Sequence, residues 1–155
     1  MISEFGTLRD DEIKVLLDAP VHVAILIAGA DGEIDKKEIK QALELAQGKQ
    51  SREREQLIDY YKEVGQGFET KFFKLVEEMP DEVDSRNSAI SMELRKLNHI
   101  LPKIDQNFAV KLVASLKDMA KKVAGASGGV LGYMSVSYEE AKLIELDMIK
   151  DPADY

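Results

Sequence analysis

The chain has 155 residues, a length that suits one domain. It contains no cysteine, which excludes disulfides, thiolate catalysis and thiolate metal sites. Its 29 acidic residues outnumber its 21 basic residues, giving a net charge of -8, so cations and basic protein surfaces are better partners than nucleic acid. We expect a single domain over residues 1–155, of which residues 1–7 are flexible or vector-derived.

Apolar residues recur at helical spacing from the start of the chain. They predict a helix over residues 8–18, and Pro20 is expected to begin another, because its missing N–H costs nothing at a helix start. The run Val21–Ala28 is apolar on all sides, which predicts a central, buried helix that is too short to span a membrane. Further helices are expected over residues 36–47 and 51–64, each followed by glycine.

The second half of the chain continues the pattern. Phe68 and Phe72 begin an apolar stripe that stops at Pro80, and Phe73 is expected to join them in the core. After an acidic turn, a helix is expected over residues 90–101, then a long helix capped by Asp105. Its inward positions are expected to be Ala109, Leu112, Val113, Leu116, Ala120 and Val123. A last helix is expected over residues 138–149. The predicted fold class is therefore all-α, a compact single-domain bundle of about seven or eight helices.

Two segments of the chain resemble each other. Each leaves an apolar helix through Ala-Gly-Ala, turns on a polar residue followed by glycine, and enters a new helix; we call residues 28–38 the first hinge and residues 124–140 the second hinge. Asp35 and Glu38, like Ser137 and Glu140, have the spacing of a capping box at the start of a helix. The pattern indicates two related helix–loop–helix units that pack together, each supplying one hinge.

The first hinge also matches the later part of an EF-hand loop, in Asp31-Gly32-x-Ile34-x-x-x-Glu38. The first and third ligand positions of such a loop fall on Ile27 and Gly29, whose side chains cannot coordinate calcium. A self-sufficient EF-hand is therefore excluded. The carboxylates can bind a hard cation only if other parts of the fold complete its coordination shell.

The first hinge resembles the A-x-A-D-G-x-[IV]-x-x-x-E hinge of the TerB-like (tellurite-resistance) family, and the second hinge resembles that family's second hinge. This resemblance implies a compact helical bundle, a role in tellurite resistance and related stress responses, and a divalent-cation site built from acidic residues. The matched acids are Asp31 and Glu38, with Glu139 or Glu140 in the second hinge. Ser127 stands where the first hinge has Asp31, which removes one carboxylate from a symmetric two-hinge site.

The candidate metal ligands are thus Asp31, Asp35, Glu38 and Glu140, and their oxygen donors favour Ca²⁺ or Mg²⁺. The alternative is purely structural, because Asp-Gly is a common turn pair and acids complement the dipole at a helix N-terminus. His22, in the most apolar helix, is expected to be a core residue rather than a ligand.

Together with the patterns above, the resemblance implies a non-enzymatic, cytoplasmic stress-response module that binds a divalent cation, a protein partner, or both. The partner is expected at a membrane-associated stress complex, and nucleic acid is not expected. Two other functions are consistent with the sequence: a metal-dependent enzyme that uses the acidic hinge, and a purely structural adaptor. The oligomeric state does not follow from the sequence.

Overall fold

The computed structural model describes residues 5–29, 44, 55–125, 143 and 145–154. In these ranges the chain forms helices and turns and no strand, so the all-α fold class is confirmed for them. The elements are α1 (Asp10–Ala28), α3 (Glu55–Gly65), α4 (Phe68–Glu78), α5 (Val83–Arg95), α6 (Leu97–Ile100) and α7 (Gln106–Gly125), with short 3-10 helices at Leu101–Lys103 and Pro152–Asp154. Of the helix predicted over residues 36–47, only residue 44 is described, and it is helical and exposed. The first residues of the helix predicted over 51–64 lie outside the described ranges.

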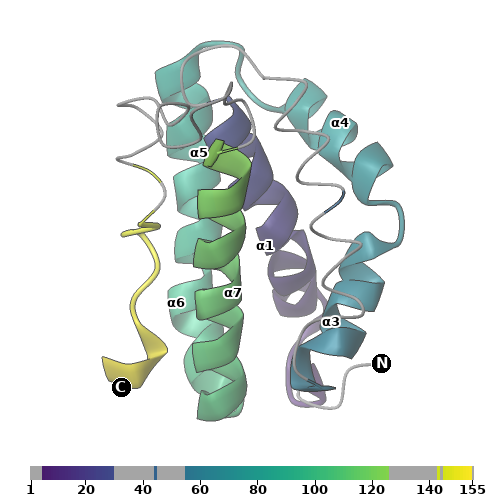
Figure 1. Ribbon diagram of the computed structural model, residues 1–155, viewed down its shortest axis with the longest axis vertical. Helices are drawn as coiled ribbons and strands as arrows, with labels where there is room; N and C mark the ends of the chain where they lie inside the picture. Colours follow the sequence, from purple (N-terminus) through teal and green to yellow (C-terminus); the bar gives the residue numbers. More distant parts are fainter. Residues whose placement is uncertain (1–4, 30–43, 45–54, 126–142, 144, 155) are drawn as a thin grey trace.

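Helix α1 is the centre of the bundle. It contacts α3, α4, α5, α6 and α7, which surround it in Figure 1. Every residue from Asp18 to Ala28 is buried, and Ile25, Leu26 and Ile27 are 0% exposed. The predicted central position of the run Val21–Ala28 is confirmed. No helix in the described part of the chain is long and apolar enough to cross a membrane.

The prediction that Pro20 begins a helix is wrong, because Pro20 lies inside α1. Proline lacks the N–H that would bond to the carbonyl four residues earlier, here that of Leu16. The hydroxyl of Tyr60 on α3 donates to this carbonyl oxygen at 2.6 Å. Burial raises the pKa of Tyr60 well above its ordinary value, so the hydroxyl stays a donor. A tertiary hydrogen bond thus replaces the one that proline removes, and the helix continues.

The helix predicted over residues 90–101 begins earlier and is divided. Glu82 caps α5 by accepting hydrogen bonds from the backbone N–H groups of Asp84 and Ser85, so residues expected in an acidic turn are helical. The backbone interrupts the helix at Lys96, where α5 gives way to the short α6. The capping role predicted for Asp105 is confirmed, since its Oδ2 accepts from the backbone N–H of Phe108 at 3.0 Å. All the inward positions predicted for α7 are buried.

The prediction of a helix reaching Ile149 is wrong for residues 145–149, which form turns. Leu146 has a φ of 50°, in the left-handed region that ends a helix, yet its side chain is fully buried. The Asn98 side chain holds this segment by donating to the Met148 carbonyl at 2.9 Å and accepting from the Lys150 N–H at 2.8 Å. Tertiary contacts therefore override the helical spacing of this segment.

Aromatic side chains join the first described residues to the core. Phe5, in the segment expected to be flexible, is 1% exposed and packs edge-to-face on Tyr60 and Phe108. Phe72 is buried as predicted, whereas Phe73 is 46% exposed. Consecutive residues of a helix point about 100° apart, so the face that buries Phe72 turns Phe73 toward solvent.

Candidate functional site

The four predicted metal ligands, Asp31, Asp35, Glu38 and Glu140, all lie outside the described residues. The structure does describe the two helices that lead into the hinges, because α1 ends at Ala28 and α7 at Gly125. The position of these two helix ends is therefore what the structure contributes to the candidate metal site.

Helices α1 and α7 lie side by side and run in the same direction (Figure 1). Contacts at their starts fix this orientation. The rings of Phe5 and Phe108 are 5.7 Å apart between centroids, and Lys103, just before α7, forms an ion pair with Glu12 in the first turn of α1 at 2.6 Å. The C-terminal ends of both helices consequently lie at the same end of the molecule, so both hinges begin there.

The end of α1 is held by a buried arginine. Arg86, on α5, is 5% exposed, and its Nη2 donates to the carbonyl of Gly29 at 2.7 Å. A guanidinium at this point complements the negative end of the α1 dipole. The contact also explains the glycine: a Cβ at Gly29 would lie 2.5 Å from Arg86 Nη2. The Nε atom of Arg86 is buried without a hydrogen-bond partner in the described part of the chain.

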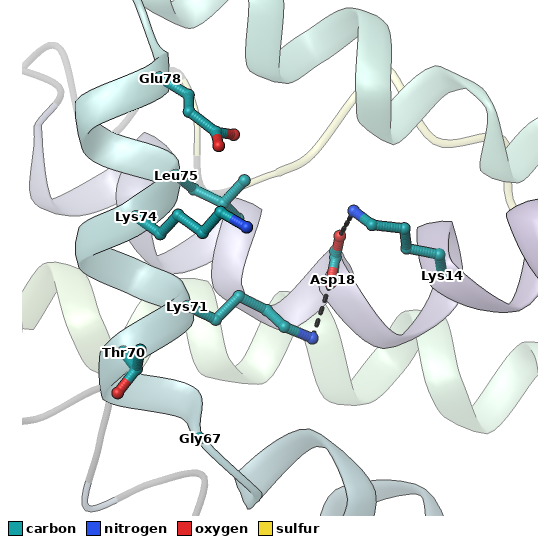
Figure 2. A pocket seen from close by; sticks show the side chains of 8 residues that line it. All are labelled: Lys14, Asp18, Gly67, Thr70, Lys71, Lys74, Leu75 and Glu78. Atoms are coloured by element: carbon teal, nitrogen blue, oxygen red, sulfur yellow. Dashed lines mark hydrogen bonds and ion pairs between the residues drawn. The ribbon is translucent and has the colours of Figure 1, made fainter.

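A second polar cluster lies between α1 and α4. Asp18, 2% exposed, receives a hydrogen bond from Lys14 Nζ to Oδ2 at 2.7 Å, and Lys71 Nζ lies 2.8 Å from its Oδ1 (Figure 2). Burial by itself would raise the pKa of Asp18, but the two ammonium groups outweigh it, so the pKa lies below its ordinary value. The carboxylate is therefore ionised at neutral pH and ties α4 to α1.

Sequence reasoning missed this cluster. The spacing of Lys14 and Asp18 by four residues on a helix was a usable signal for an ion pair. Lys71 carried no such signal, because only the packing of α4 against α1 brings it to Asp18.

His22 is 5% exposed, as predicted for a core residue. Burial lowers its pKa; Asp18 and Glu93 raise it in part, and Lys14 and Lys96 lower it further. The imidazole is neutral at pH 7. Among the described residues, no three histidine or acidic side chains gather as a metal site would require.

The chain matches no family model, and no curated protein or solved structure resembles it significantly. The likeness to TerB-like proteins accordingly rests on the two hinge motifs in the sequence.

Proposed function

We propose that the protein is a non-enzymatic stress-response module, similar to TerB-like tellurite-resistance proteins, that binds Ca²⁺ or Mg²⁺ through its hinge acids. The ligands in this proposal are Asp31, Asp35 and Glu38 of the first hinge and Glu140 of the second. The observation that carries the proposal is the parallel arrangement of α1 and α7, whose C-terminal ends lie at the same end of the molecule. Two hinges that start from neighbouring points are able to contribute to one site.

The chemistry of the donors agrees with this choice of metal. Carboxylate oxygens favour hard cations such as Ca²⁺ and Mg²⁺ over zinc or copper. Several carboxylates in a short segment repel one another when no cation is bound, so binding should stabilise the folded state. Arg86 fixes the end of α1 at Gly29, and thereby the point from which the first hinge departs.

The test is thermal unfolding in EDTA and in millimolar Ca²⁺ or Mg²⁺. A cation at 100 times its dissociation constant adds about 2.7 kcal/mol to the free energy of unfolding, which raises the Tm of a domain of this size by roughly 5–10 °C. The double variant Asp31→Asn, Glu38→Gln should lose this rise. A control with the same charge change, Asp59→Asn with Glu77→Gln, removes two exposed acids of α3 and α4 and should keep it.

Coincident melting curves together with no binding heat in calorimetry would contradict the cation site. The hinge would then be a structural element, and the adaptor alternative would be favoured, with a protein partner at a membrane-associated stress complex. Cation-dependent turnover of a substrate that disappears in the Asp31→Asn, Glu38→Gln variant would instead favour the enzyme.

A further inference from the structure

The cluster around Asp18 lines one side of a groove of about 430 Å³ between α1 and α4, which we call the α1–α4 groove. Its walls are formed by Lys14, Asp18, Gly67, Thr70, Lys71, Lys74, Leu75 and Glu78 (Figure 2). Three lysines face two acids here, whereas the whole chain carries a net charge of -8. The lining residues thus carry one more positive than negative charge, although Glu93, outside the lining, also acts on Lys14. The excess of ammonium groups lies on α4, at Lys71 and Lys74, and such groups attract anions.

The lysines of the groove are not all used by Asp18. Lys71 Nζ forms an ion pair with Asp18 Oδ1 at 2.8 Å, so one side of its ammonium group is already engaged. An ammonium group has three N–H donors, so Lys71 keeps donors for a second acceptor beside Asp18. The side chain of Lys74 makes no ion pair or hydrogen bond with any described residue, and Figure 2 shows it extending from α4 into the groove.

The start of α4 adds to the positive potential. Its N-cap, Gly67, supplies no side-chain hydrogen bond to the first turn, and both Gly67 and Thr70 line the groove. The free N–H groups of a helix start and its dipole favour a negative charge. Lys71 and Lys74 are spaced three residues apart, so they project from neighbouring positions of the same helix face.

We propose that the α1–α4 groove binds a small anion, a carboxylate or a phosphate, between the ammonium groups of Lys71 and Lys74. Asp18 serves as the fixed counter-charge that holds Lys71 in place before the anion arrives. The apolar stems of the lysines and the side chain of Leu75 would contact the uncharged part of a small molecule. The volume of the groove falls in the range of small-ligand pockets. This site is independent of the hinge acids.

The experiment is a titration of the ¹⁵N-labelled protein with inorganic phosphate, and separately with succinate, followed by NMR at constant ionic strength. Shifts confined to the amides near residues 67–75 are expected with at least one of the two anions; the arm that gives them identifies phosphate or carboxylate as the preferred group. Lys74→Gln should weaken binding about threefold, as expected for one solvent-exposed charge contact. Glu78→Gln should strengthen it, because an acid is removed beside Lys74.

Matched controls separate this site from general charge attraction. Lys62→Gln removes an exposed lysine of α3 outside the groove, and Glu77→Gln removes the exposed neighbour of Glu78; both should leave the affinity unchanged. Equal weakening by Lys62→Gln and Lys74→Gln would overturn the proposal. So would shifts spread over the whole surface, shifts centred elsewhere, or none with either anion.

Discussion

We expect the hydrogen bond from Tyr60 to the Leu16 carbonyl to be what keeps α1 continuous at Pro20, and removing it tests this explanation. Replacing Tyr60 with Phe keeps the buried ring and removes only the hydroxyl, so the Leu16 oxygen loses its tertiary donor. A buried carbonyl left without a partner costs about 1–3 kcal/mol. For a domain of this size, that lowers the Tm by roughly 2–10 °C. Urea denaturation of both proteins measures the loss.

A second substitution isolates the cause. In a Pro20→Ala background, residue 20 has an N–H that can bond to the Leu16 carbonyl within the helix, so the hydroxyl of Tyr60 is no longer needed. The cost of Tyr60→Phe should then fall below about 0.5 kcal/mol, a coupling of roughly 1 kcal/mol or more between the two positions. Tyr61→Phe is the control: its hydroxyl is bonded to Ser115 Oγ, and its cost should be the same in both backgrounds. If Tyr60→Phe costs the same with proline or alanine at position 20, the reasoning is refuted.

Two further predictions concern buried groups on α1. Gly29→Ala should destabilise the protein by about 1–3 kcal/mol in urea denaturation, because the new Cβ would lie 2.5 Å from Arg86 Nη2 and 3.2 Å from the Ile25 carbonyl oxygen. In an Arg86→Ala background most of this cost should disappear, since Gly29 has an ordinary φ of -104° and only the milder contact with Ile25 remains. An undiminished cost there would assign the effect to the backbone instead of Arg86. His22 binds fewer protons when folded than unfolded, because its pKa is lowered. Above the unfolded pKa of about 6.5, His22 is neutral in both states and does not reduce the free energy of unfolding. As the pH falls below that value, the unfolded state gains a proton that the folded state does not, and the free energy of unfolding decreases. The urea midpoint should drop between pH 7.5 and 5.5, less so in His22→Gln than in a His99→Gln control, and equal drops in both variants would reject the assignment.

The sequence predicted the elements whose burial follows from their own pattern. The run Val21–Ala28 is apolar on every side, so it had to be central in any helical bundle, and the inward stripe of α7 needed only the helical period. The cap at Asp105 is likewise a local feature. The prediction of a helix boundary at Pro20 was wrong because the hydroxyl that replaces the missing hydrogen bond belongs to Tyr60. Tyr60 lies about forty residues away in the chain, so the sequence around Pro20 does not indicate this donor.

The same distinction explains what the sequence revealed about sites. The hinge acids were found because their motif is contiguous, from Asp31 to Glu38, and their role as ligands remains a prediction. The α1–α4 groove was missed because its residues come from two helices, and the sequence of neither helix predicts that they pack together. Lys14 and Asp18 share a helix and were detectable, whereas Lys71 reaches Asp18 only through the packing of α4.

Three buried or half-buried polar side chains hold α1, each from a different helix. Tyr60 of α3 contacts its middle at the proline, Lys71 of α4 contacts it beside that point, and Arg86 of α5 contacts its end. Apolar packing alone permits a smooth helix to rotate or slide at small cost, but a hydrogen bond or ion pair requires one register. These contacts therefore fix the rotation and the axial position of α1. Both proposed sites depend on that position, because one wall of the α1–α4 groove belongs to α1 and the first hinge departs from its last turn.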